Sequence, residues 1–147
     1  MSAREQRATV DRRSGALIVC SYSKTTAGFW IMNGHYDRLP DDIDEEHLGV
    51  AVLTALDASK HGVAVPSRTG TPFDPVLREL GLRSYGQYMT GTAQVAVTAL
   101  DGVTIAPNHN GGTRQGFTEI EADTEVIHDP RSISLAAGVH RGLARAT

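Results

Sequence analysis

The sequence predicts a single-domain α+β protein with a mainly antiparallel sheet packed against two longer helices and short helical turns. The 147 residues are 40% hydrophobic and 21% charged, which is ordinary for one globular domain of this size. Two stretches, near residues 44–60 and 131–145, show helical periodicity. The strand-like stretches follow one another through short turns instead of alternating strictly with helices, which favours an antiparallel arrangement.

The first half begins with a segment that has no periodicity and almost no large apolar side chains. We therefore expect a flexible N-terminal tail over residues 1–14 and the folded domain over residues 15–147. Residues 16–22 are apolar and β-branched enough for a buried strand, and residues 29–32 form a second apolar run. The polar segment 23–28 joins them and predicts an antiparallel hairpin.

The strongest helical pattern covers residues 44–60, where Leu48 and Val52 begin an apolar stripe. Aspartates at its amino end offer oxygens that can cap the free N–H groups of a first helical turn. Proline near the start and glycine after the end predict a short helix over residues 73–80. A further helical turn is expected over residues 84–89.

The second half has the character of strands. Residues 94–99 alternate, and an Asp-Gly pair predicts a hairpin that returns over residues 103–106. We expect residues 108–113 to form a loop. Two short strands are then predicted over residues 116–120 and 125–128.

The last predicted element is a helix over residues 131–145, opened by an Asp-Pro pair. Its apolar residues recur at helical spacing and are expected to face the core. These inward positions are Ile133, Ala136, Ala137, His140 and either Leu143 or Ala144. Most aromatic residues are likewise assigned to the core instead of a ligand cage. They are Phe29, Trp30, Tyr36, Tyr85, Tyr88 and Phe117.

Composition excludes several classes of protein. No apolar run approaches the roughly 20 residues of a membrane span, and the polar N-terminal segment lacks the apolar core of a secretory leader. A net charge of −3, from 14 basic and 17 acidic residues, argues against a nucleic-acid binder with a strongly basic face. The single cysteine, Cys20, excludes an internal disulfide and is expected to be buried and inert. We therefore expect a cytoplasmic protein that binds neither membranes nor nucleic acid.

The sequence carries no motif for catalysis or for a cofactor. Segment 110–116 is rich in glycine but lacks the lysine of a phosphate-binding loop, so we interpret it as a link between strands. The six histidines lack the spacing of zinc ligands. A Gly-x-Ser-x-Gly elbow for nucleophilic catalysis is also absent from the sequence. We accordingly predict no catalytic residue, no cofactor and no metal.

Carboxylates are concentrated in two stretches. Capping and the helix dipole explain part of the first, which lies at a predicted helix start. The other interpretation is an acidic surface that attracts and holds a basic partner. The candidate binding residues are Asp41, Asp42, Asp44, Glu45 and Glu46, followed by Glu119 and Glu121.

Six short segments follow one another in a familiar order. They are residues 23–31 (SKTTAGFWI), 48–59 (LGVAVLTALDAS), 65–68 (VPSR), 83–88 (RSYGQY), 105–107 (IAP) and 116–117 (GF). This succession resembles the immunity proteins of bacterial contact-dependent growth inhibition (CDI) systems. The resemblance extends over most of residues 16–143 and leaves out the N-terminal segment.

The resemblance implies a small cytosolic protein that binds and neutralises the C-terminal toxin domain of a delivered effector. Such toxins are commonly nucleases, and the immunity protein has no catalysis of its own. A nuclease holds a polyanion, so its active surface is usually basic, and carboxylates can compete for that surface. Immunity surfaces differ between toxin types, so no toxin-contact residue is carried over from the family.

Two other interpretations stay open at this point. A small cytosolic enzyme would have a cleft between loops 66–71 and 108–112, with Arg68, His109 and Arg114 as its polar groups. A nucleic-acid binder would instead use the arginines of the N-terminal segment. These are Arg4, Arg7, Arg12 and Arg13.

Overall fold

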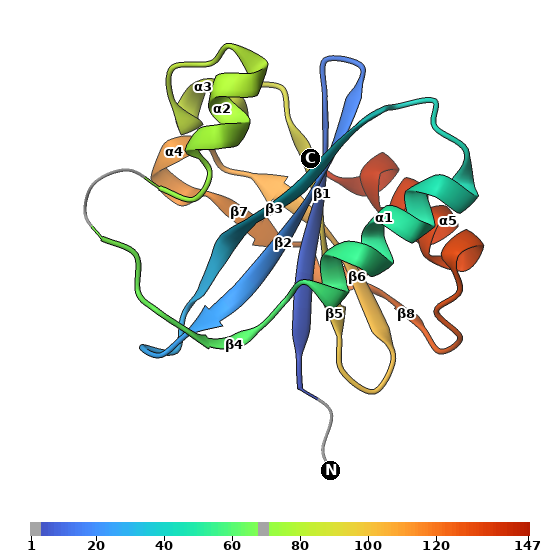
Figure 1. The fold of residues 1–147 in the computed structure, drawn as a ribbon. Coiled ribbons are helices and arrows are strands. Elements are labelled where there is room, and N and C mark those ends of the chain that lie inside the picture. The colour runs from blue at the N-terminus through green and yellow to red at the C-terminus, as the bar shows by residue number, and fades with distance from the viewer. Residues whose placement is uncertain (1–3, 68–70) are drawn as a thin grey trace.

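An eight-stranded sheet and five helices make up residues 4–67 and 71–147, the part of the chain that the computed structural model describes (Figure 1). The strands are β1 (Gln6–Arg13), β2 (Ala16–Thr25), β3 (Trp30–Pro40), β4 (His61–Val63), β5 (Ala93–Ala99), β6 (Val103–Asn110), β7 (Phe117–Glu119) and β8 (Glu125–Ile127). The helices are α1 (Glu45–Asp57), α2 (Asp74–Leu80), α3 (Tyr85–Met89), α4 (Gly112–Gln115) and α5 (Ser132–Arg145), with a 3₁₀ turn, η1, over Glu121–Asp123.

The sheet is antiparallel apart from one short pairing. Its strand order is β3-β2-β1-β5-β6-β7, with β8 also beside β6, and among the described strands only β4 runs parallel to its neighbour, β2. The predicted hairpins β2–β3 and β5–β6 are both present. The α+β prediction is therefore confirmed.

Strand β1 is central in the sheet, which the sequence analysis did not predict. It pairs with β2 on one side and with β5 on the other, and its Val10 side chain is fully buried. The prediction of a flexible tail over residues 1–14 is thus wrong for residues 6–13, while residues 1–3 lie outside the described part. Only Ala8 and Val10 are apolar in this strand, so its hydrophobic pattern is too faint to recognise.

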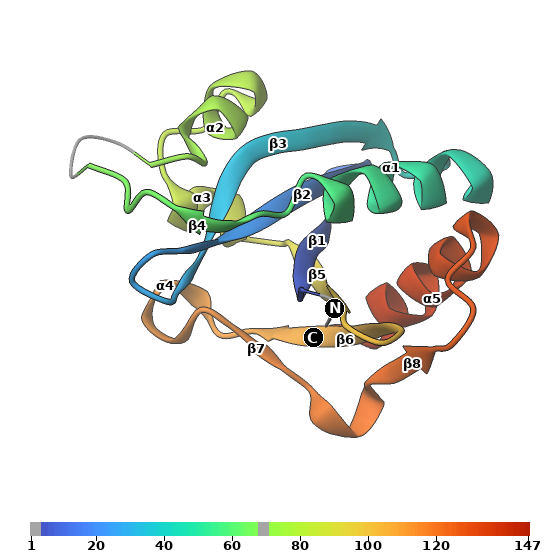
Figure 2. The ribbon, with the colours of Figure 1, turned by 60° about the horizontal axis from the view of Figure 1, so that its bottom comes forward.

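Helices cover the two faces of the sheet unequally. Figures 1 and 2 show α1 and α5 side by side on one face, and α2 and α3 over one end of the other face. Leu48, Val52 and Leu135 belong to the main core, with Val10 and Val95 of the sheet. The second core lies under α2 and α3. It contains Ala16, Ile18, Cys20, Met32, Phe73, Val76, Leu77 and Tyr88.

The buried stripe of α5 differs from the predicted one. Ile133 was expected to face the core and is 57% exposed, and His140 is only partly buried. The stripe lies instead over two glycines, because a Cβ on Gly138 or Gly142 would come within 2.8 Å of side chains of β5 and β6. The spacing of apolar side chains does not predict this face, because its close packing depends on two positions that have no side chain. The buried residues of α5 are Leu135, Ala136, Gly138, Val139, Gly142 and Leu143.

Two further predictions were wrong. The expected loop over residues 108–113 instead continues β6 to Asn110 and enters α4, although segment 110–116 does link two strands, β6 and β7, as interpreted. The Asn110 side chain explains both, since its Nδ2 donates to Met89 O (2.6 Å) and its Oδ1 accepts from Gly112 N (3.0 Å). Of the six aromatic residues assigned to the core, only Tyr88 is buried, and Phe29 and Tyr85 are about half exposed.

A row of hydrogen-bonded polar side chains lies buried between the sheet and α3. Tyr88 Oη donates to Asp11 Oδ2 (2.5 Å), Gln94 Nε2 donates to Asp11 Oδ1 (2.8 Å), and Asn108 Nδ2 donates to Gln94 Oε1 (2.7 Å). Burial raises the pKa of Asp11 to about 6, although both hydrogen bonds act in the opposite direction. Burial also raises the pKa of the neighbouring Cys20 thiol, as expected of an inert cysteine.

The ionisation of Asp11 makes stability depend on pH. Folding favours the protonated form of Asp11, because its pKa is higher in the folded state than in the unfolded state. The resulting contribution to the free energy of unfolding is fully present below the unfolded pKa of 3.8 and is lost as the pH rises through about 6. At 1.36 kcal/mol per pKa unit this amounts to about 3 kcal/mol. An asparagine at this position does not ionise, so we expect the stability of Asp11→Asn, measured as the free energy of unfolding, to rise by about 2–3 kcal/mol relative to that of the wild type as the pH goes from about 4.5 to about 7.5. Urea unfolding of both proteins measures this difference, and parallel pH profiles would contradict it.

Helices α1 and α5 cross in direct backbone contact. A Cβ placed on Gly49 of α1 would lie 1.9 Å from Ser132 O, the carbonyl of the first residue of α5. No side chain fits there unless the helices move apart. A Cβ on Gly138 would instead meet the ends of two flexible isoleucine side chains at 2.7 Å, which can yield.

We expect Gly49→Ala to lower the free energy of unfolding by about 2–3 kcal/mol, the upper part of the range for overpacking. Gly138→Ala is the matched control, because it gains the same helix propensity but meets only movable methyl groups. It should cost clearly less. Chemical denaturation of the two variants compares them, and equal losses would argue against a rigid crossing at Gly49.

Candidate functional site

The first group of predicted carboxylates forms an exposed acidic turn, which we define as Asp41, Asp42, Asp44, Glu45 and Glu46. All five residues are exposed, on the loop after β3 and the first turn of α1. The loop is anchored, since Asp41 N donates to Gly15 O and Ile43 N donates to Pro40 O, both at 3.0 Å. The backbone therefore presents these carboxylates to solvent in a fixed arrangement.

Asp44 has a structural role that the other four lack. Its Oδ1 accepts from His47 N at 2.9 Å, and its Oδ2 lies 2.6 Å from His47 Nδ1. The hydrogen bond from the His47 backbone N–H, aided by that from the imidazole, lowers the pKa of this carboxyl. Asp44 is thus the N-cap of α1, and Glu45 and Glu46 lie where the helix dipole favours negative charge.

Glu125, which follows the second group of predicted carboxylates along the chain, is neutralised within the protein. Arg141 of α5 donates from Nε to Glu125 Oε2 at 3.0 Å and from Nη2 to Oε1. These bonds lower the pKa of Glu125, and Glu125 together with nearby Glu45 raises the pKa of Arg141. Arg141 therefore offsets some of the negative charge beside the acidic turn.

Glu119 does not extend the acidic turn. Glu119 lies at the end of β7 and lines a cavity of 130 Å³ with Arg7, Thr9 and Trp30. Thr9 alternates along β1 with Val10, which faces α1 and α5, so this cavity lies on the opposite face of the sheet. Glu119 and Glu121 are both exposed, but the structure places Glu119 away from the first cluster.

An aromatic groove, which the sequence analysis missed, continues from that cavity. A hollow of 330 Å³ shares Tyr22 and Trp30 with it and is also lined by Phe73 and Tyr85. Phe73 and Tyr85 meet edge to face at 5.1 Å between ring centroids, and the Arg7 guanidinium lies 4.5 Å from the Trp30 ring centroid. Trp30 and Tyr85 are assigned to the core from the sequence, and that assignment concealed this groove.

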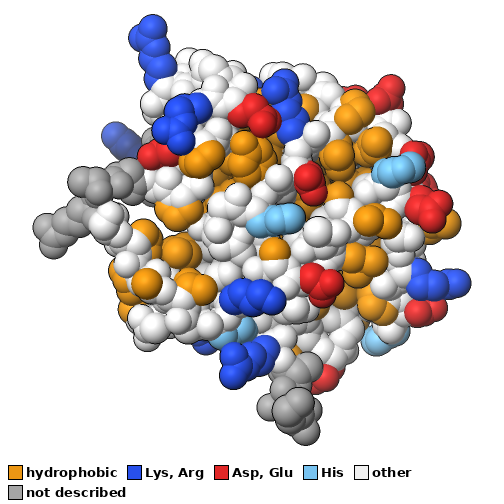
Figure 3. All heavy atoms as spheres, viewed as in Figure 1, with side chains coloured by type: hydrophobic (Ala, Val, Ile, Leu, Met, Phe, Trp, Pro, Cys, Tyr) orange, Lys and Arg blue, Asp and Glu red, His pale blue; other side chains and the backbone are white. Residues whose placement is uncertain are grey.

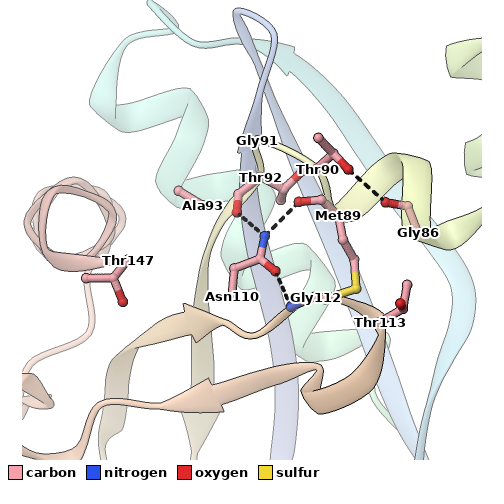
Figure 4. A pocket seen from close by; sticks show the side chains of 10 residues that line it. All are labelled: Gly86, Met89, Thr90, Gly91, Thr92, Ala93, Asn110, Gly112, Thr113 and Thr147. Atoms are coloured by element: carbon pink, nitrogen blue, oxygen red, sulfur yellow. Dashed lines mark hydrogen bonds between the residues drawn. The ribbon is translucent and has the colours of Figure 1, made fainter.

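The cleft of the alternative enzyme interpretation does not form as expected. Pro66 and Thr71 line the aromatic groove, whereas the loop after β6 lines a separate hollow of 620 Å³ beside α3. Figure 4 shows that the polar side chain of Asn110 in this hollow is directed at neighbouring backbone groups. Neither His109 nor Arg114 lines the two cavities, and Arg68 lies outside the described residues.

Within residues 4–67 and 71–147, no three His, Cys, Asp or Glu side chains gather closely enough to hold a metal ion. In the same part of the chain, none of the helices combines the length and apolar character that crossing a membrane requires.

Comparisons with known proteins identify the fold. No protein-family model matches the sequence, and no curated protein does. A protein of unknown function from Neisseria meningitidis has a TM-score of 0.81 at 20% identity, over 100% of this chain and 98% of that chain. A chain of the CdiA-CT/CdiI toxin and immunity complex from Yersinia pseudotuberculosis has a TM-score of 0.80 at 14% identity, over 100% of both chains. At such low identities the likeness shows the fold alone.

The cap formed by Asp44 can be separated from its charge. Asn caps helices as well as Asp does, whereas Ala removes the oxygen that accepts the His47 N–H. We expect Asp44→Ala to lower the thermal midpoint by roughly 2–8 °C and Asp44→Asn to stay close to the wild type near neutral pH. Differential scanning calorimetry measures both. If the Asn variant loses as much as the Ala variant, the charge matters more than the cap.

Proposed function

We propose that this chain is the immunity protein of a toxin–immunity pair. It would bind and neutralise the C-terminal toxin domain of a CDI effector and would have no catalysis of its own. The observation that carries the proposal is the likeness of fold, over the full length of both chains, to a chain of the CdiA-CT/CdiI complex. The exposed acidic turn provides a surface for such a partner.

The succession of sequence segments that resembles CDI immunity proteins supports the assignment of this chain as the immunity protein and not the toxin. Three of them correspond to the β2–β3 hairpin, to α1 and to the middle of β6. These elements build the sheet and its main core, so the resemblance concerns the scaffold. The surface that recognises the toxin must therefore be found from charge and exposure.

A nuclease toxin gives the acidic turn a physical role. An enzyme that cleaves RNA or DNA has a basic surface for the phosphate backbone. Carboxylates presented on a fixed turn attract that surface at long range and, once docked, exclude the nucleic acid. Both proteins would meet in the cytoplasm, where such a nuclease finds its substrate.

Reversing charge on the acidic turn tests this role. We choose Asp42→Lys with Glu46→Lys, because this pair spares the cap Asp44. The control is Asp37→Lys on β3 with Glu79→Lys on α2, which changes the net charge equally. The partner to test is the C-terminal domain of a large secreted effector, sought in the reading frame directly upstream.

We expect the first variant to associate about tenfold more slowly at low salt, with a flatter salt dependence, and to protect cells less well from the co-expressed toxin domain. The control should behave like the wild type. Stopped-flow binding and a growth assay measure the two effects. If the first variant associates and protects like the wild type, the acidic turn is not part of the interface. If the wild-type chain arrests growth when it is expressed alone, it is the toxin and not the immunity protein.

A further inference from the structure

The crossing of α1 and α5 leaves two large apolar side chains outside the core. Val50 follows Gly49, and Ile133 follows Ser132, the two residues whose backbones touch. Val50 is 51% exposed and Ile133 is 57% exposed. Single exposed apolar residues are common, but these two flank one contact between neighbouring helices.

Two hollows beside α1 and α5 add further apolar surface. One, of 270 Å³, is lined by Leu53, Leu100 and Pro130, and Leu53 lies one turn after Val50 on α1. The other, of 340 Å³, is lined by Ile133 and by Arg131, the neighbour of Pro130. The resulting surface, called here the α1–α5 strip, consists of Val50, Leu53, Leu100, Pro130 and Ile133.

Acidic side chains outnumber basic ones around this strip. Glu46 of the acidic turn lies one helical turn before Val50, and therefore on the same side of α1. Asp57, Asp101 and Arg4 line the first hollow, and Asp129 pairs with Arg131 at 3.1 Å. Figure 3 shows hydrophobic side chains exposed over α1 with acidic side chains beside them.

We propose that the α1–α5 strip is the apolar centre of the surface that receives the toxin domain. This inference rests on the proposed function and names the partner's chemistry: an aliphatic or aromatic side chain of the toxin, surrounded by its lysines and arginines. The charge around the strip complements such a partner and repels an acidic one. An apolar centre within a charged rim is also how protein interfaces are built.

The aromatic groove on the opposite face of the sheet is the competing surface. It carries the Arg7 guanidinium above Trp30, with Glu119 in the adjoining cavity. One cation and one carboxylate offer no excess of charge that would select a basic partner. The strip, continuous with the acidic turn through Glu46 and Val50, is the surface that matches a nuclease.

The two parts of this surface should affect binding kinetics differently. Long-range attraction by carboxylates changes the association rate, whereas burial of apolar side chains at the centre of an interface changes the dissociation rate. Removing the apolar groups of the strip should therefore shorten the lifetime of the complex without slowing its formation.

The experiment measures association and dissociation of the upstream-encoded toxin domain by biolayer interferometry. The test variant is Val50→Ser with Ile133→Ser, and Ile133→Thr alone keeps a branched side chain in case the double variant folds poorly. Val126→Ser is the matched control, because Val126 is 52% exposed and pairs with Thr104, away from α5. Tyr85→Ser reports on the aromatic groove.

We expect the double variant to dissociate about tenfold faster or more, with an association rate within about twofold of the wild type. The single variant should show a smaller change in the same direction, and both controls should match the wild type. Wild-type dissociation of the strip variants, or faster dissociation of Tyr85→Ser or Val126→Ser, would overturn the inference. If the wild-type chain does not bind the toxin domain at all, the proposed function itself fails, which is a separate result.

Discussion

The backbone contact between Gly49 and Ser132 fixes how the helical layer lies on the sheet. Because a Cβ at Gly49 would overlap the Ser132 carbonyl, the two helices cross at a distance that only glycine permits. This distance brings the start of α1 and the start of α5 to one side of the molecule. The acidic turn and the α1–α5 strip are neighbours for that reason, although more than 80 residues separate Glu46 from Ile133 in the sequence.

The opposite face of the sheet combines a second apolar core with a buried carboxyl group. Asp11 lies in the central strand and accepts hydrogen bonds from Tyr88 of α3 and Gln94 of β5. A buried carboxyl is expensive unless it is hydrogen-bonded or neutral, and here it is hydrogen-bonded while its pKa is raised. This arrangement attaches α3 to β1, and Tyr85 at the start of α3 lines the adjoining aromatic groove. The two faces of the sheet thus offer surfaces of different chemistry.

The sequence was most informative where side chains of one kind recur. The stripe of α1, the hairpins and the two short helices followed from spacing and turn residues, because burial there depends on apolar side chains. It was least informative where structure depends on small or polar residues: β1 has only Ala8 and Val10 to bury, and α5 packs through Gly138 and Gly142. The same limit applies to the site, since the acidic turn was visible in the sequence but the exposure of Ile133 was not.

The acidic turn and the α1–α5 strip have complementary effects on binding, because charged and apolar contacts contribute differently in water. Exposed ion pairs contribute little to affinity because solvent and salt screen them, so carboxylates alone would give rapid but short-lived complexes. Apolar contacts have almost no effect at long range, but once water is excluded they slow dissociation and strengthen the charge interactions at their edge. A protein that must neutralise a nuclease before it reaches nucleic acid needs both rapid binding and a long-lived complex. Adjacency of the two surfaces is therefore a physical requirement of the proposed function, and the crossing at Gly49 meets it.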